Sequence, residues 1–382
     1  MSNTLTQLIP DLYQSLDIVS RELAGFIPSV TLDASAERAA LNQPIRIPLT
    51  PASKADDVTP GQLPPDNGDQ IIDNVPLTIT KSRMVPFRWE GEQQKGIKSG
   101  PGYHGIRRDQ IAQAMRTLVN EIEDDLGDLF RRASRAAGEA GKTPFKDTLT
   151  DTAQVRKILT DNGAPLSDLQ CVIDTTAGAA LRTMAQLTKA NEAGTTSLRA
   201  QGTLLELHGF TLRESAGVAE NTGAKAEKLS VSDDLETGAL IIPVAGASAN
   251  VKPEIPASVE PGSVVLLGKH KYVVAGVSPG EAIIIHRPGL MDNVKAGAKF
   301  DVISEFSANF AFSRSAIILA TRAPALPEEG DMADDRIMIT DPRTNMSFEV
   351  SMYKQYRRVR YEIAAAWGCQ NIKPEHTAVL LG

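Results

Sequence analysis

The chain has 382 residues, of which 42% are hydrophobic and only 5% aromatic, so wholesale disorder is excluded and any core is mainly aliphatic. Its 40 Lys and Arg against 47 Asp and Glu give a formal charge of −7 and a sequence pI near 5.4, whereas a dedicated duplex-DNA binder normally carries a strongly basic domain. This length suffices for two or three domains, and we expect at most passive contact with nucleic acid.

Two cysteines, Cys171 and Cys369, lie far apart in the sequence. This spacing favours neither a disulfide framework nor a zinc site, and it indicates a reducing compartment. The first residues lack the basic and apolar regions of a secretory signal, and no apolar run approaches the ~18 residues of a membrane span. The sequence thus predicts a soluble protein that is cytoplasmic when made.

Residues 1–41 begin with an amphipathic pattern. Gly25 and Pro28 end a helix whose apolar stripe is Leu8, Leu12, Leu16, Val19 and Leu23. Such a helix, with no adjacent core, needs a surface to cover. It folds back on its own chain or it forms an arm that contacts another copy, in which case Leu8, Leu12, Leu16 and Leu23 make the contact.

Residues 42–91 are predicted to form an extended hairpin. A proline-edged strand at 44–49 and returning strands at 75–80 and 84–89 flank a long polar tract. Two strands cannot bury a core alone, and so long a connector is either functional or a floppy surface loop. In the functional interpretation the hairpin reaches onto a neighbouring subunit, and its contact residues are Arg46, Lys54, Asp56, Asp57, Asp66 and Asp69.

Residues 92–149 contain the clearest helix, predicted over 107–137. Apolar residues keep 3-4 spacing along its length, which would extend roughly 45 Å and offer one face to a sheet. Acidic residues come first and Arg131, Arg132 and Arg135 follow. The arginines either complement the partial negative charge of a helix C-terminus or meet acidic groups of a partner.

Residues 150–222 form a predicted supersecondary unit that offers no chemistry. A helix ends at Asn162-Gly163, a short strand covers 171–173, and Thr175 or Thr176 caps a second helix. A hairpin then pairs 198–207 with 210–215 around a His208-Gly209 turn.

Residues 223–303 change to β character, with short Val, Ile and Leu runs separated by Gly and Pro. This pattern predicts a small barrel or sandwich. Because mixed α/β character returns over 304–382, the β segment is predicted to be inserted within the preceding domain.

Catalytic motifs are weak. Gly100 to Gly105 matches G-x-G-x-x-G but follows a polar stretch rather than a buried strand, and Gly141-Lys142-Thr143 lacks the first glycine of a phosphate-binding loop. The five histidines show no metal-ligand spacing, and acidic doublets such as Asp124-Asp125 lie on solvated stretches. We therefore predict no enzymatic activity and no catalytic, metal-binding or cofactor-binding residues.

Three segments resemble a known family. Residues 158–215, residues 309–316, and residues 361–382 with Trp367-Gly368 and Lys373-Pro374-Glu375, resemble major capsid proteins of tailed bacteriophages. The resemblance covers nearly the full length and is closest to the P-twenty-two-type coat family, which has a Hong Kong ninety-seven-type fold and an insertion domain.

This resemblance implies an α+β fold of defined parts. These are an N-terminal arm at 1–41, an extended E-loop at 42–91, a P domain at 92–149 with its spine helix, the first part of an A domain at 150–222, an inserted β domain at 223–303, and a return to the A and P domains at 304–382.

It also implies a structural coat subunit that forms the pentamers and hexamers of an icosahedral shell around double-stranded DNA. The implied partners are copies of itself, a scaffolding protein, a portal and a decoration protein, with no cofactor and no membrane. Its implied location is the virion, assembled in the host cytoplasm. Two alternatives remain open: an encapsulin-type cargo compartment and a nucleotide-binding enzyme that uses Gly100 to Gly105.

Overall fold

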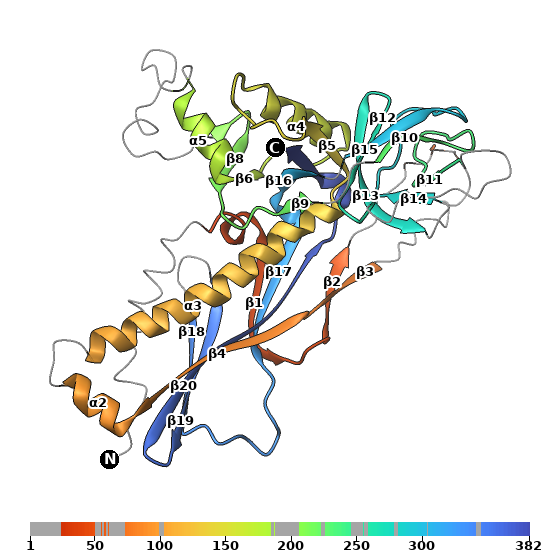
Figure 1. The fold of residues 1–382 in the computed structure, drawn as a ribbon. Coiled ribbons are helices and arrows are strands. Elements are labelled where there is room, and N and C mark those ends of the chain that lie inside the picture. Colours follow the sequence, from red (N-terminus) through yellow and green to blue (C-terminus); the bar gives the residue numbers. More distant parts are fainter. Residues whose placement is uncertain are drawn as a thin grey trace.

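The computed structural model describes residues 24–49, 55, 57–58, 60, 73–98, 103–184, 187, 206–222, 226–245, 255, 259–278, 282–303, 305–340 and 345–382. These residues form an elongated α+β molecule, which confirms the predicted class (Figure 1). A long helix and a narrow sheet run diagonally along one half. A second, wider sheet with helices occupies the other half, and a β-rich region lies beside it.

The long helix α3 (Tyr103–Gly127) packs lengthwise on the first sheet. The strand order is β1 (Thr31–Ala39), β17 (Ile317–Pro324), β20 (Arg358–Asn371), β19 (Ser347–Gln355) and β18 (Asp335–Thr340), and β4 (Lys81–Glu90) pairs with the other edge of β20. Side chains alternate across a strand, so every second residue of β20 faces the helix. Ile363, Ala365 and Trp367 are buried there with Met115, Leu118 and Ile122 of α3 in one apolar cluster.

The helix is shorter than predicted. It ends at Gly127, a 3-10 turn η3 (Asp128–Arg132) follows, and Ala133 is already extended. Residues Arg135–Gly138 form strand β5, which pairs with β13 (His270–Ser278) and β21 (Thr377–Leu381). The apolar spacing of Leu129, Phe130 and Ala133 continued the helical pattern, but the sheet ladder formed by β5 determines the backbone beyond it.

The predicted hairpin is also divided. β2 (Pro44–Leu49) pairs with β3 (Asp73–Thr78) in a two-stranded ribbon, whereas β4 pairs over its whole length with β20. Residues 81–90 therefore belong to the first sheet, and α2 (Gly91–Lys98) follows them.

The second sheet carries the unit predicted at 150–222. β6 (Leu169–Ile173) pairs in parallel with β8 (Phe210–Glu214) and antiparallel to β16 (Glu305–Ser313), beside β21 and β5. Helices α4 (Thr150–Asp161) and α5 (Thr175–Thr183) bury their apolar faces with these strands. The cap of α5 is Asp174, whose carboxylate accepts from Thr176 and Ala177 N–H, rather than either threonine.

The predicted turn at His208-Gly209 is present. It joins β7 (Glu206–Leu207) to β8, and both residues have positive φ (51° and 81°), as a tight hairpin turn requires. The predicted pairing partners 198–205 lie outside the described residues.

The β-rich region has its own core. Its strands are β10 (Ala226–Ser230), β11 (Ile241–Pro243), β12 (Val264–Leu267), β13, β14 (Ala282–Ile285) and β15 (Lys299–Ile303), and they enclose a separate apolar cluster. The flanking strands β9 (Glu220–Thr222) and β16 pair with each other, so the chain leaves and returns at one place. This topology agrees with an insertion, although its identity as the family's insertion domain stays a prediction.

Short 3-10 turns complete the described chain: η2 (Ile27–Ser29), η4 (Arg314–Ala316) and η5 (Pro374–His376).

Candidate assembly surfaces

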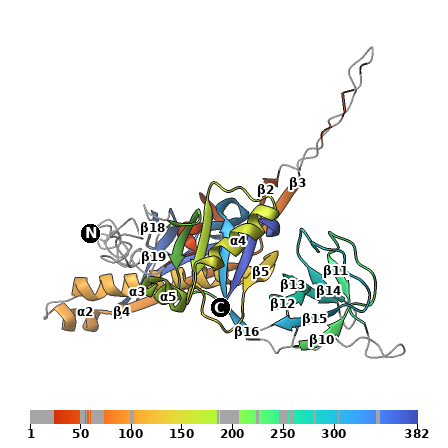
Figure 2. The same cartoon turned by 90° about the horizontal axis from the view of Figure 1, so that it is seen from above.

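The β2–β3 ribbon protrudes from the body of the molecule (Figure 2). Ile45 and Ile47 are half-buried on one face, where they pack with Leu77 against a small cluster on the first sheet that includes Ile318, Ala320 and Ala366. Arg46 points to the exposed face opposite Pro76. A two-stranded ribbon is marginal on its own, and this one is stabilised by packing its apolar face on the first sheet.

The root of the ribbon is fixed on β20. The Thr80 N–H donates to the Trp367 carbonyl oxygen at 3.0 Å, and the Asn42 N–H donates to the Ile79 carbonyl oxygen at 2.9 Å. A Cβ on Gly368 would lie 2.0 Å from the Thr78 carbonyl oxygen. Only glycine therefore allows β3 to approach β20 so closely.

A buried carboxylate joins the N-terminal segment to α3. Glu123 is 4% exposed and accepts from the N–H groups of Gly25, Phe26 and Ile27 at 3.2, 3.0 and 2.7 Å, and from the Ser215 hydroxyl at 2.8 Å. Burial raises the pKa of Glu123, an effect that the four donors oppose. This one side chain thus holds three parts of the chain together: residues 25–27, α3 and the end of β8.

The three arginines predicted at the helix C-terminus lie in two different elements. Arg131 lies in η3, where its Nη1 donates to the Pro261 carbonyl oxygen at 2.9 Å and its guanidinium lies 5.3 Å from the Phe130 ring centroid. Arg132 is exposed in the same turn. Arg131 therefore connects the helix end to the β-rich region within one chain.

Arg135 is not a helix residue, contrary to the prediction. It lies in β5, is 2% exposed, and its Nη2 donates to Ile158 O at 3.2 Å and Asn162 Oδ1 at 2.8 Å. These hydrogen bonds hold β5 to the end of α4, and so buried a side chain offers little surface to a partner.

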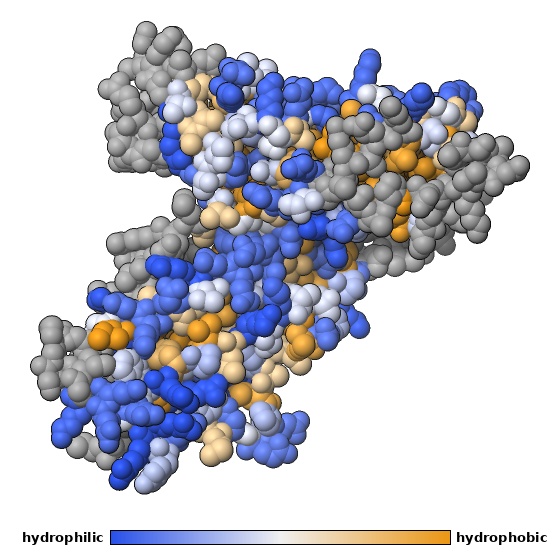
Figure 3. All heavy atoms as spheres, viewed as in Figure 1, coloured by the Kyte–Doolittle hydropathy of each residue, from blue (hydrophilic) through white to orange (hydrophobic). Residues whose placement is uncertain are grey.

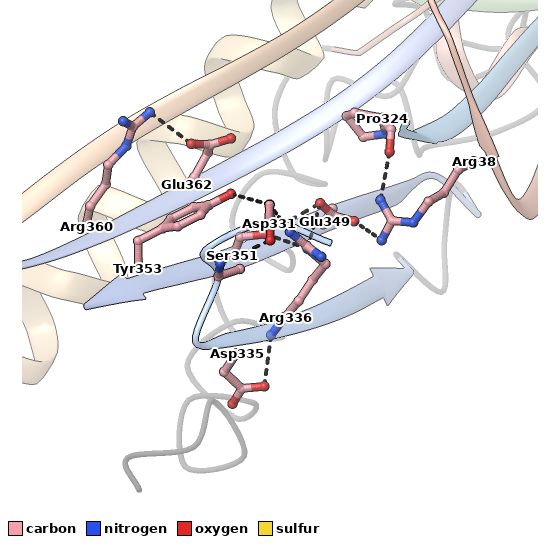
Figure 4. A network of polar contacts seen from close by, with 11 residues as sticks. Arg38, Pro324, Asp331, Asp335, Arg336, Glu349, Ser351, Tyr353, Arg360 and Glu362 are labelled. Carbon is pink, nitrogen blue, oxygen red and sulfur yellow. Dashed lines mark hydrogen bonds and ion pairs between the residues drawn. The ribbon is translucent and has the colours of Figure 1, made fainter. Parts of the chain in front are cut away.

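A polar network that the sequence did not predict covers the side of the first sheet opposite α3 (Figure 4). Glu349 of β19 is 4% exposed and forms ion pairs with Arg38 of β1 and with Arg336 of β18, the latter at 3.2 Å. Arg336 also pairs with Asp331, which accepts from the Tyr353 hydroxyl at 3.1 Å.

These contacts connect the edge strands β1 and β18 through β19. Burial alone would raise the pKa of Asp331, but the Ala333 N–H, Tyr353 and Arg336 lower it. The signal in the sequence was alternation: Glu349, Ser351 and Tyr353 repeat at every second residue of one strand, which places them on one face. Their partners Arg38 and Arg336 come from other strands and could not be assigned without the topology.

Hydrophobic residues reach the surface in both halves of the molecule. On the face in Figure 3, hydrophobic patches interrupt the hydrophilic residues along the helix and its sheet, and others lie over the β-rich region. Ile241 and Ile284, cross-strand partners in β11 and β14, are 55% and 37% exposed. No helix in the described part is long and apolar enough to cross a membrane.

Of the predicted contact residues in the ribbon and its connector, Arg46 and Asp57 are described, and both are exposed. The remaining predicted contact residues lie outside the described residues: Leu8, Leu12, Leu16, Leu23, Lys54, Asp56, Asp66 and Asp69. Their roles stay predictions.

The weak catalytic motifs gain no support. The element before the Gly100 motif is helix α2 rather than a strand, and Gly100 itself lies outside the described residues. Among the residues described, no group of three or more His, Cys, Asp or Glu is arranged to hold a metal ion. Burial raises the pKa of both thiols, Cys171 and Cys369, to about 12, which makes them poor nucleophiles.

No protein-family model matches the sequence, and no curated protein matches it either. Solved structures resemble it at low identity. A chain of Mycobacterium phage Che8 is 12% identical with a TM-score of 0.47, over 89% of this chain and 84% of that one. A capsid chain of cyanophage P-SCSP1u is 11% identical with a TM-score of 0.47, over 92% of this chain and 86% of that one. A chain of a virus-like particle from Pyrococcus furiosus is 7% identical with a TM-score of 0.44, over 98% of this chain and 100% of that one.

Proposed function

We propose that this chain is the major coat subunit of a tailed-phage head, which self-assembles into pentamers and hexamers of an icosahedral shell around double-stranded DNA. The observation that carries the proposal is the β2–β3 ribbon, which projects from the body and leaves Arg46, Pro48 and Pro76 exposed for contact with a neighbouring copy. The resemblance of residues 158–215 and 361–382 to phage capsid proteins supports the same function.

Assembly multiplies weak contacts. A ribbon and an amphipathic arm that are incomplete on one subunit can complete one another around closed symmetry. The net charge of −7 suits a wall that confines DNA without binding it tightly. A scaffolding protein, a portal and a decoration protein are the partners we propose in addition, with assembly in the host cytoplasm and a switch in ribbon and arm as DNA fills the head.

The test is expression of the full chain with and without residues 56–69. We expect the intact chain to form closed particles by electron microscopy, and the deletion to leave a folded subunit, judged by circular dichroism, that forms none. Replacing 56–69 by a Gly/Ser segment of equal length controls for the length of the connector. Normal particles from the deletion variant would contradict the assignment of the connector within residues 42–91 as an assembly element.

The contents of the particles distinguish the two kinds of shell. Nucleic acid and a portal vertex are expected for a phage head, whereas an enclosed enzyme would indicate a cargo compartment.

A further inference from the structure

A basic crevice of about 530 Å³ lies between the loop at 139–149, helix α4 and the β12–β13 turn. Six cationic side chains line it: Arg135, Lys142, Lys146, Lys157, Lys269 and Lys271. Three acidic groups, Glu139, Asp147 and Asp151, line it as well, so the crevice carries a net charge of about +3 in a chain whose total is −7.

Part of this positive charge is free. Lys157 pairs with Asp161 at 2.7 Å, Lys142 lies 3.7 Å from Glu139, and Lys271 donates to the Gly138 carbonyl oxygen. Lys146 and Lys269 are exposed, and none of the ion pairs or hydrogen bonds found among the described residues involves their side chains. Two unpaired ammonium groups from different parts of the chain thus face one crevice.

The loop that carries Lys142 and Lys146 is held in place. Phe145 is fully buried, although its φ is 61°, and its N–H donates to Asp151 Oδ2 at 2.9 Å. A bulky residue with positive φ is strained and persists only where its surroundings fix it. The neighbouring lysines are therefore presented from a fixed backbone.

We propose that the basic crevice docks the acidic connector at residues 50–72 of a neighbouring copy. This inference rests on the proposed function and names the partner of the ribbon. The connector contains Asp56, Asp57, Asp66 and Asp69 but only one basic residue, Lys54, so its charge is opposite to that of the crevice. It joins the ends of a ribbon that projects away from its own body. Half of a connector of this length can reach about 35 Å when extended, which is enough to cross a subunit boundary.

The first test measures binding directly. The full-length chain is titrated into a fluorescent peptide of residues 50–72, and anisotropy is followed at low and high salt. We expect binding that weakens as salt rises, and that weakens about tenfold or more in Lys146→Glu with Lys269→Glu. The matched control, Lys299→Glu with Lys373→Glu, changes the net charge equally outside the crevice and should bind as the parent does.

Three results would overturn the docking proposal: equal binding by the crevice variant, equal binding of a peptide with all four aspartates changed to asparagine, or binding of tripolyphosphate in place of the peptide. The last would identify a small-anion site.

The second test uses assembly of the full chain. Lys146→Glu with Lys269→Glu should reduce particle formation, and adding Asp56→Lys with Asp57→Lys should restore it. If the parent chain binds the peptide but forms no particles, the proposed function fails while docking stands. If particles form equally in all variants and the peptide does not bind, docking fails while the proposed function stands.

Discussion

At the scale of single residues, two positions determine how separate segments meet. Gly368 allows β3 to touch β20, and Glu123 accepts four hydrogen bonds that join the N-terminal segment, α3 and the end of β8. Each contacts segments that are distant in the sequence, so its role cannot be predicted from the residues next to it.

Gly368→Ala should destabilise the subunit by about 1–3 kcal/mol, because the new methyl group meets backbone atoms on β3 that have little freedom to move. Urea unfolding measures the change. Gly276→Ala is the matched control, since it is also a strand glycine and nothing lies within 4 Å of its added Cβ. Equal stability of the two variants would show that β3 is not held against β20.

Glu123→Gln should cost about 1–3 kcal/mol, because an amide NH₂ would replace a carboxylate oxygen that faces N–H or O–H donors. Urea unfolding at pH 5 and pH 8 measures both stability and its pH dependence.

The sign of the pH dependence follows from the raised pKa of Glu123. Above its ordinary value of 4.5 the folded state keeps a proton that the unfolded state releases, so stability falls as pH rises through the folded-state pKa. The parent should lose stability relative to Glu123→Gln between pH 5 and pH 8. The exposed Glu328→Gln should have the same unfolding free energy as the parent at both pH values. If the difference in unfolding free energy between the parent and Glu123→Gln did not change with pH, the raised pKa of Glu123 would be contradicted.

At the scale of elements, the division of the predicted hairpin is the main finding. Strand β4 lies in the first sheet under α3, where Lys81 pairs with Asp125 at 2.7 Å and Trp89 Nε1 donates to Gln110 at 2.8 Å. Only β2 and β3 remain to project. They form a ribbon with no third strand among the described residues, and its apolar face packs on Ile318, Ala320 and Ala366 of the first sheet.

The N-terminal arm gives a second prediction at this scale. Leu12→Asp with Leu16→Asp should leave the subunit folded and reduce particle formation, because two charges would interrupt the apolar stripe at helical spacing. Gln7→Asp with Gln14→Asp, on the opposite helical face, is the control. Particle yield by sedimentation and electron microscopy decides the outcome, and unchanged yield in the stripe variant would refute the arm contact.

At the scale of the whole molecule, three large apolar clusters and the small one under the ribbon coexist in one elongated shape. The helix and first sheet share a core with part of the second sheet, α4 and α5 cover the other side of that sheet, and the β-rich region encloses its own cluster. The β-rich region contacts the rest of the molecule along one border: β13 pairs with β5 through Lys271 and Tyr272, Val264 and Val273 join the core under α3, and Arg131 donates to Pro261 O.

Residues 223–304 expressed alone should therefore fold. We expect a β-type circular dichroism spectrum and a cooperative thermal transition, because strands β10 to β15 bury Val265, Val274 and Ile283 against one another. Val265→Asp, which would bury a charge, is the variant that should abolish the transition. A featureless melt of the parent segment would show that it depends on β5.

The sequence by itself determined the local elements of this protein. Residue spacing and turn residues predict four of them: the apolar stripe of α3, the strand at 44–49, the turn at His208-Gly209 and the separate β-rich segment. They can do so because apolar periodicity and turn chemistry act over a few positions. The α+β class was implied by the resemblance to phage coat proteins.

Only the tertiary structure decided where elements end and what they join. The helical pattern continued past Gly127, yet pairing with β21 and β13 drew residues 135–138 into a sheet and buried Arg135. The partners of Glu349 and of Glu123, like the lysines of the crevice, come from segments tens to hundreds of residues apart. Burial and charge pairing depend on distance in space, which neither periodicity nor composition encodes.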